Sequence, residues 1–193
     1  MGITAGALGA AEARLTDNVT FVAEANIETN FSDSDAARER TQVSKLRWGD
    51  SEEIAAVRPP FDLILGSDII YHKDSNDELA DTIAALSGPG TVVLWATPDG
   101  AGGDDSAPAY GSPVSDLCAE FFTRLREVHG FEMDDISEDD EVVAAIDEVS
   151  PTTGAEAGFD AFSTYYVRGP IRVTRMHAPA AAPAPAPAPR SRL

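Results

Sequence analysis

Three side chains suited to ligand binding stand where apolar, strand-like segments end. Asp17 follows the segment 11–16, Trp48 ends the segment 41–48, and Asp68 follows the apolar run 61–67. An acid at such a position commonly accepts hydrogen bonds from ribose hydroxyls, and a large aromatic ring can stack on a purine. Because ligands of open α/β sheets bind beyond the carboxyl ends of the strands, this spacing predicts a site for a nucleotide-like ligand.

Each of these residues also has a purely structural interpretation. Asp17 could cap the helix that follows it, which is the favoured interpretation on position alone. Trp48 could close the hydrophobic core, as most tryptophans do. For Asp68 the functional interpretation is favoured, because Gly66 and Ser67 precede it directly after an apolar run. Gly66 would allow a ligand to approach the backbone closely.

Two further features lie just beyond Asp68. Tyr71 carries a phenol that could line a substrate channel. Asp68, His72, Asp74 and Asp77 are close in sequence, and hard cations bind such carboxylates. No ligand spacing of a known metal site occurs there, so we expect a solvated loop and no metal.

The elements that must position these residues alternate between strands and helices. A predicted helix over 18–30 places Val19, Val22, Ala23, Asn26 and Ile27 on one face. The other predicted helices cover 74–86, 114–128 and a short part of 134–148, and the strands cover 11–16, 41–48, 61–67, 91–96, 131–136 and 161–168. The run Leu63 to Leu65 predicts a strand covered on both faces. The alternation predicts an α/β domain with a mostly parallel sheet and an antiparallel edge strand.

Composition narrows the class of partner. The net charge of −19 would repel phosphate backbones and anionic lipid, so we expect no nucleic acid and no membrane partner. A basic protein substrate suits this charge better, although solubility alone would also explain it. The single cysteine and the lack of a signal-like N-terminus favour a cytoplasmic protein. The Ala-Pro repeat predicts a domain over 1–176 and a disordered tail over 177–193.

Three stretches together resemble one enzyme family. They are LTDNVTFVAEANIETN at 15–30, KLRWGD at 45–50 and FDLILGSDIIYH at 61–72. In type, order and spacing they are similar to motifs of the seven-β-strand methyltransferases that use S-adenosylmethionine. The closest likeness is to the methyltransferase-like protein-lysine methyltransferases. The resemblance implies a Rossmann-like sheet and methyl transfer to a lysine of a protein substrate.

The resemblance also implies a role for individual residues. Asp17 would bind the ribose of the cofactor, Trp48 would flank its adenine, and Ser67 would contact it through the backbone. Asp68 would lie beside the methionine moiety or orient the lysine amine. Tyr71 would shape the lysine channel.

One departure from the family pattern concerns its first strand and glycine-rich loop. These should precede the present Met1, so that Gly2 would be the last glycine of the loop. We therefore expect a seven-stranded methyltransferase sheet that lacks its first strand. Three alternatives remain open: a degenerate domain with a non-catalytic binding role, a small-molecule methyltransferase, and another nucleotide-binding enzyme such as a dehydrogenase. The last lacks a GxGxxG motif. The sequence gives no indication of oligomeric state.

Overall fold

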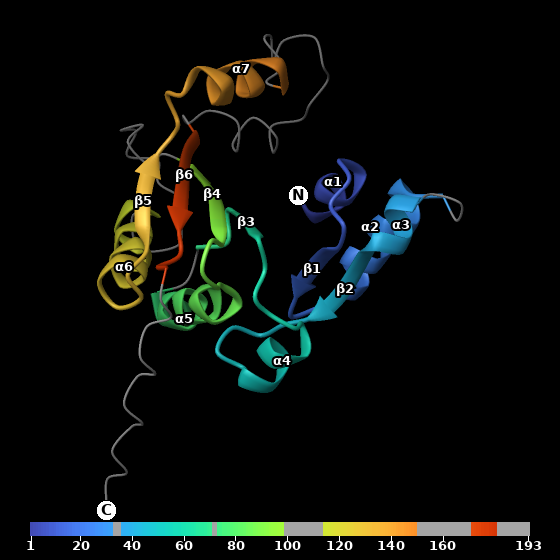
Figure 1. The fold of residues 1–193 in the computed structure, drawn as a ribbon, viewed down its shortest axis with the longest axis horizontal. Coiled ribbons are helices and arrows are strands. Elements are labelled where there is room, and N and C mark those ends of the chain that lie inside the picture. Colours follow the sequence, from blue (N-terminus) through green and yellow to red (C-terminus); the bar gives the residue numbers. More distant parts are fainter. Residues whose placement is uncertain (33–35, 71–72, 99–113, 150–170, 181–193) are drawn as a thin grey trace, which may run out of the picture.

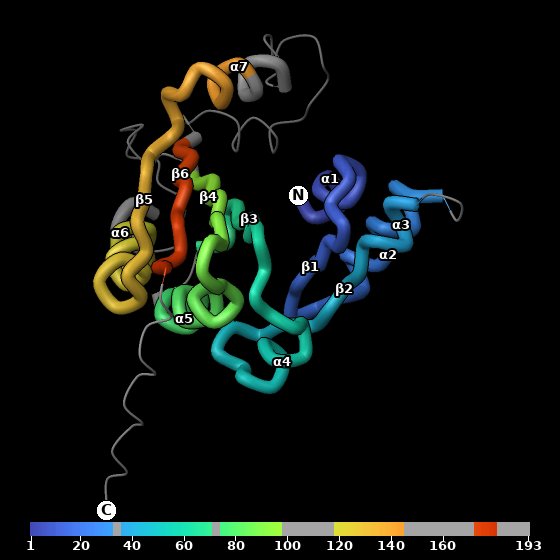
Figure 2. The backbone as a smooth tube through the Cα atoms, viewed as in Figure 1, coloured from blue at the N-terminus to red at the C-terminus, as the bar shows by residue number. Residues whose placement is uncertain are grey.

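The computed structural model describes residues 1–32, 36–70, 73–98, 114–149 and 171–180 (Figures 1 and 2). Several predictions lie outside these residues: Tyr71 and its channel, the strand over 161–168, and most of the tail. Within the described ranges the structure is an α/β fold with two sheets, one of two strands and one of four. No described helix is long and apolar enough to span a bilayer.

The first sheet and its helices form one group of elements. β1 and β2 pair in parallel, with Leu15 beside Val43 in the register. The apolar side chains Ile27, Phe31 and Ala37 form a small buried core on this sheet. The elements of the group are α1 (Gly2–Ala7), β1 (Ala13–Asp17), α2 (Phe21–Asn30), α3 (Ala36–Arg40) and β2 (Thr41–Lys45).

The prediction that α2, the helix expected over 18–30, buries one continuous apolar face is wrong. Ile27 is buried, but Val19 and Val22 are 49% and 52% exposed, and Phe21 is 67% exposed. The physical reason is the width of the sheet. The sheet has two described strands, and the buried cluster on it takes Ile27 from the second half of α2, whereas Phe21 and Val22 in the first turn are exposed.

The second sheet has the order β3-β4-β6-β5. β3 and β4 are parallel, and β6 is antiparallel to both β4 and β5. The antiparallel strand therefore lies one position in from the edge. The elements of this group are β3 (Leu63–Ser67), η1 (Lys73–Ser75), α5 (Asn76–Leu86), β4 (Val92–Pro98), α6 (Val114–Glu127), β5 (Glu132–Asp135), α7 (Asp140–Val149) and β6 (Ile171–His177).

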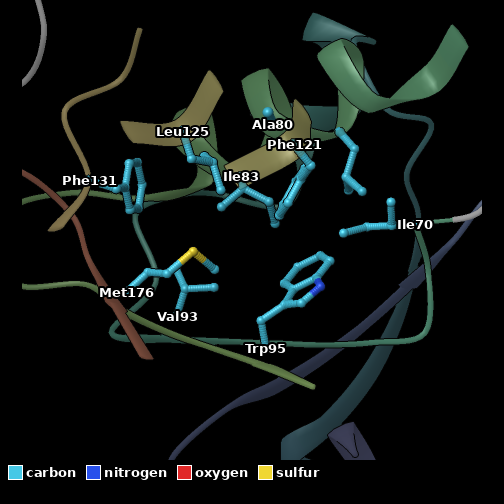
Figure 3. Packing of buried hydrophobic residues seen from close by; sticks show 10 residues of the cluster. Ile70, Ala80, Ile83, Val93, Trp95, Phe121, Leu125, Phe131 and Met176 are labelled. Carbon is cyan, nitrogen blue, oxygen red and sulfur yellow. The ribbon is translucent and has the colours of Figure 1, made fainter. Parts of the chain in front are cut away.

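The main core lies between this sheet and the helices α5 and α6 (Figure 3). Trp95 on β4 and Phe121 on α6 are at most 1% exposed, and their ring centroids are 4.9 Å apart. Gly66 on β3 leaves the space that the indole fills, because a Cβ there would lie 2.2 Å from Cε3 of Trp95. The strand that carries Ser67 and Asp68 is thus fixed against the largest side chain of the core.

The expectation that the third strand is covered on both faces is wrong. Leu63 is 47% exposed, whereas Ile64 on the opposite face packs against two buried clusters, so β3 is covered on one face only at this position. The short helix α4 (Ser51–Ala56) lies in the segment that joins β2 to β3. Beside it Leu46, Val57 and Leu86 form a third buried cluster, which connects the two groups of elements.

Candidate functional site

Asp17 lies at the end of β1 with an exposed carboxylate. Its Oδ1 accepts a hydrogen bond from the Val19 amide at 2.9 Å. The helix α2 begins four residues later with Thr20 as its N-cap residue, so the helix-cap interpretation of Asp17 is wrong. Asp17 therefore closes a local turn, and its side chain is exposed.

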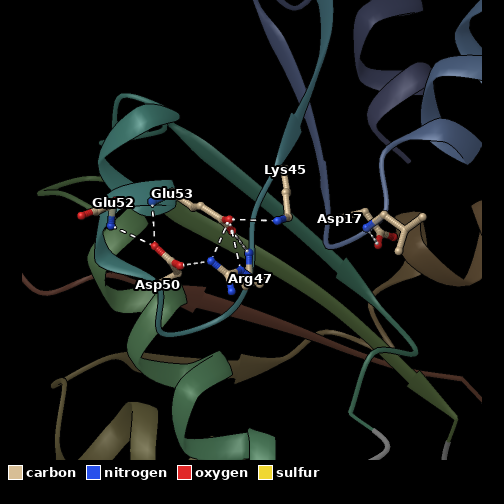
Figure 4. Close-up of polar contacts among 7 residues, drawn as sticks. Asp17, Lys45, Arg47, Asp50, Glu52 and Glu53 are labelled. Atoms are coloured by element: carbon tan, nitrogen blue, oxygen red, sulfur yellow. Dashed lines mark hydrogen bonds and ion pairs between the residues drawn. The ribbon is translucent and has the colours of Figure 1, made fainter.

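The loop after β2 is held by an ion-pair network (Figure 4). The Arg47 guanidinium contacts the carboxylates of Asp50 and Glu53, and Lys45 Nζ lies 3.4 Å from Glu53. Asp50 Oδ1 also accepts the amides of Glu52 and Glu53 at 3.1 and 3.0 Å, which caps α4. These amide hydrogen bonds, with Arg47, lower the pKa of Asp50, so its carboxylate remains ionised at neutral pH.

Trp48 and Gly49 form the apex of this loop. The Trp48 indole is half-buried and packs on the main core with part of its surface open. Gly49 has φ of +77°, a conformation that favours glycine. Its amide donates to Thr82 Oγ1 at 2.8 Å, and the Thr82 hydroxyl donates to the Glu78 carbonyl at 2.7 Å. The loop is therefore anchored to α5 directly beside the tryptophan.

Ser67 and Asp68 occupy the end of β3. Ser67 pairs with Ala96 of β4, and the Asp68 amide donates to the Ala96 carbonyl at 3.2 Å. Asp68 has φ of +52°, which is uncommon for a residue with a side chain and recurs at functional sites. Its carboxylate is exposed. Burial, with a smaller contribution from the charge of Asp68, raises the pKa of the Cys118 thiol on α6.

The structure does not bring all the predicted site residues together. The Asp17 carbonyl accepts the Leu46 amide at 2.9 Å, and Leu46 packs near Phe61 and Leu86, where β3 begins. Asp68 lies beyond the other end of β3. Figure 1 shows the same arrangement: the arrows of β1 and β2 point toward α4, whereas that of β5, which runs parallel to β4, points toward α7. The carboxyl ends of the two sheets thus face different ways.

The other predicted residues fall into one or the other group. Gly2 starts α1 and faces Leu15, where a Cβ would lie 2.6 Å from Cδ1, so it belongs to the first core. Trp48 lies between the two groups, because its loop follows β2 of the first group and is hydrogen-bonded to α5 of the second. Tyr71 lies outside the described residues. The ligand-binding roles of all these residues remain predictions.

Two sets of contacts were missed by sequence reasoning. One is the Gly49–Thr82 hydrogen bond, whose only signal is a hydroxyl on the apolar side of α5, between Leu79 and Ile83. The other joins α5 to the end of α6. Asp81 accepts Nε and Nη2 of Arg124 at 2.8 Å each, and its Oδ1 lies 2.7 Å from His129 Nε2.

Neither a metal site nor a pocket in the described ranges offers a better candidate for the functional site. No group of three His, Cys, Asp or Glu side chains there is placed to hold a metal ion. A pocket of about 70 Å³ lies between the end of α5 and the start of the tail, lined by residues such as Ser87, Phe131 and Pro179. None of the predicted site residues lines it, so the strand ends and the Trp48 loop remain the candidate site.

Parts of this chain are similar to known proteins. A family model described as lysine methyltransferase matches residues 1–104. A protein N-lysine methyltransferase METTL21A from Danio rerio is 32% identical over 102 residues, which cover 49% of this chain and 45% of the relative. The protein of the same name from Mus musculus is 33% identical over 99 residues, covering 50% and 43%. The chain therefore spans less than half the length of these relatives.

A solved structure of geranyl diphosphate methyltransferase in complex with SAM aligns with a TM-score of 0.48 at 11% identity, over 93% of this chain and 73% of that one. The family model matches more than half of the 193 residues, including Asp17, Trp48, Ser67 and Asp68. The chain belongs to the lysine methyltransferase family.

Proposed function

We propose that this protein is a cytoplasmic enzyme that transfers a methyl group from S-adenosylmethionine to a lysine side chain of a protein substrate. The observation that carries the proposal is the match of residues 1–104 to the lysine methyltransferase family. Two relatives named protein N-lysine methyltransferase support the choice of a protein lysine as acceptor. The net charge of −19 favours a basic substrate segment over nucleic acid.

Three residues would each bind a different part of the cofactor. The exposed oxygen of Asp17 would accept hydrogen bonds from the ribose hydroxyls. The open part of the Trp48 indole would flank the adenine. The backbone at Ser67 would contact the methionine end. When bound, the cofactor supplies an electrophilic methyl group on a sulfonium.

Asp68 would act on the substrate lysine. Its carboxylate is exposed at the end of a strand and is held at φ of +52° by the fold, so it can attract an ammonium group to one place. The amine would first have to lose a proton to solvent, and its nitrogen would then bond to the methyl carbon as the bond from that carbon to the sulfonium sulfur breaks. Because no other group has to be activated, orientation of the amine is the protein's main contribution to the rate.

The described residues fit the adenine end of the cofactor better than its ribose and methionine ends. The Trp48 loop fits the adenine end, since a half-buried aromatic ring stands on an anchored turn. Asp17 and Asp68 lie near opposite ends of β3, so the ribose and methionine ends do not meet in one described pocket.

Calorimetric titration with S-adenosylmethionine tests the proposal. We expect saturable binding, weakened by Asp17→Asn and by Trp48→Ala, followed by methyl transfer to a lysine-rich peptide. Asp62→Asn is the matched control, because Asp62 is also an exposed aspartate and lies just before β3. Absence of binding would refute the proposed function. Binding without transfer to any protein substrate would favour a non-catalytic role.

A further inference from the structure

Thr82 occupies an unusual position for a hydroxyl group. It lies in the middle of α5 and is only 1% exposed, among the side chains that face the core. A buried hydroxyl without partners would be costly, but both functions of this one are used. Its proton is donated to the Glu78 carbonyl of its own helix, and its oxygen accepts the amide of Gly49.

This arrangement fixes the direction of the hydrogen bond to Gly49. A threonine hydroxyl has one proton, and the bond to Glu78 within the helix uses it at 2.7 Å. The free lone pair then faces the Gly49 amide at 2.8 Å. Gly49 adopts φ of +77°, and a Cβ there would lie 3.4 Å from Cγ of Glu78, so the backbone of the loop lies close against α5.

The residue held by this contact is Trp48. It immediately precedes Gly49, and its indole is half-buried against the main core. On the other side of Trp48, the Arg47 amide donates to Glu53 Oε2 at 2.7 Å and the Arg47 guanidinium pairs with Asp50. With both neighbours fixed, the backbone that carries the indole is held in place before any ligand arrives, which lowers the entropic cost of binding.

The same contact joins the two parts of the candidate site. α5 begins a few residues after Asp68 and carries Thr82, whereas Gly49 follows β2. The hydrogen bond therefore links the loop of Trp48 to α5, the first α-helix after β3 in the chain.

We propose that Thr82 is a positioning residue for the adenine of the cofactor, acting through Gly49 on Trp48. This inference rests on the proposed function. It predicts that loss of the hydroxyl weakens cofactor binding without any loss of a direct contact between residue 82 and the cofactor.

The test is a double-mutant cycle on the full chain with S-adenosylmethionine as the probe. Thr82→Val keeps the shape of the side chain and removes the hydroxyl. It should weaken binding about threefold to tenfold, the range expected for one hydrogen bond. In the Trp48→Ala background the same change should have no further effect, because the group that Thr82 positions is gone.

Three further measurements separate positioning from general loss of structure. Exchange of the Gly49 amide with solvent should become faster in Thr82→Val, with or without cofactor. Thr82→Ser retains the hydroxyl and should restore both binding and protection. Thr29→Val is the matched control, because Thr29 makes the same bond within its helix, to Ala25 at 2.8 Å, but is exposed. It should change neither.

The outcomes are distinct. Equal binding by wild type and Thr82→Val overturns the positioning role and leaves the proposed function standing. A loss of equal size with and without Trp48 also overturns it. No binding by wild type overturns the proposed function and this inference together. If Thr82→Val does not fold, Gly49→Ala disturbs the Gly49–Thr82 contact from the loop side. It must then weaken cofactor binding in the wild-type background and have no effect in the Trp48→Ala background.

Discussion

Asp81 shows how a single carboxylate stabilises the contact of two helices. Hydrogen bonds from Arg124, opposed by partial burial and assisted by His129, lower the pKa of the Asp81 carboxyl. Because this pKa is lowered by folding, the ionised Asp81 carboxylate contributes fully to stability above the unfolded-state pKa of about 3.9. That contribution is lost as the pH falls through the folded-state pKa. Asp81→Asn should therefore lower the free energy of unfolding at pH 7, and the difference from wild type should vanish toward pH 2.

The expected loss at pH 7 is about 1 kcal/mol, below the usual value for charged hydrogen bonds, because 45% of the side chain is exposed. Urea unfolding at a series of pH values measures it. Asp77→Asn is the control: this carboxylate contacts Arg124 at 3.1 Å but is 73% exposed, so its loss should change little. A difference between Asp81→Asn and wild type that stays constant down to pH 2 would contradict the assignment.

Individual site residues could be predicted only where position along a strand identifies them. Asp17 and Asp68 end strands, as the sequence indicates, because apolar runs stop at them. Thr82 and Asp81 could not be predicted as contact residues, since their partners Gly49 and His129 lie 33 and 48 positions away. Such pairs depend on how helices pack, which no local pattern of residues contains.

At the scale of elements, the packing of β3 against β4 and α6 depends on one glycine. Gly66→Ala would place a methyl group 2.2 Å from Trp95, whose ring is confined by Phe121. Since buried backbone and two aromatic rings must shift, we expect a loss of about 1–3 kcal/mol in the free energy of unfolding. Thermal and urea unfolding followed by circular dichroism measure this loss.

A second substitution identifies the cause of that loss. Trp95→Phe removes part of the ring system over Gly66, so the double variant should be less destabilised than the sum of the two single changes. Ser67→Ala, one residue further along β3, is the control for substitution within the strand. Strict additivity of Gly66→Ala and Trp95→Phe would show that their contact is not the source of strain.

The elements themselves were predictable where their pattern is strong. The apolar runs of β3 and β4 and the periodic spacing of α5 and α6 indicated their type, with ends that differ by a few residues. β6 was not predicted over Ile171–His177, because Arg172 and Arg175 interrupt its apolar pattern. The arginines are tolerated in this strand because they lie 3.4 Å from Asp135 and Asp134 of β5.

At the scale of the whole molecule, the described residues form two main hydrophobic cores of unequal size, with the smaller cluster of Leu46, Val57 and Leu86 between them. The first contains Ile27, Phe31 and Ala37, on a sheet of two strands. The second surrounds Trp95 and Phe121, under a sheet of four strands. The alternating pattern correctly indicated an α/β fold. It could not indicate two separate sheets, because the residues of one strand do not specify which other strand pairs with it.

This division predicts that unfolding is not a single transition. The first group has a small buried cluster, and its parallel pair has no third strand among the described residues, so it should open at lower urea concentration than the second. Hydrogen exchange measured by segment across a urea series should show β1 and β2 losing protection before β4 and β6. Ile27→Ala should shift only the first step, and Leu125→Ala, at a fully buried position of α6, should shift mainly the second. Loss of protection at one common midpoint in all four strands would instead mean that the cluster of Leu46, Val57 and Leu86 couples the two cores into one cooperative unit.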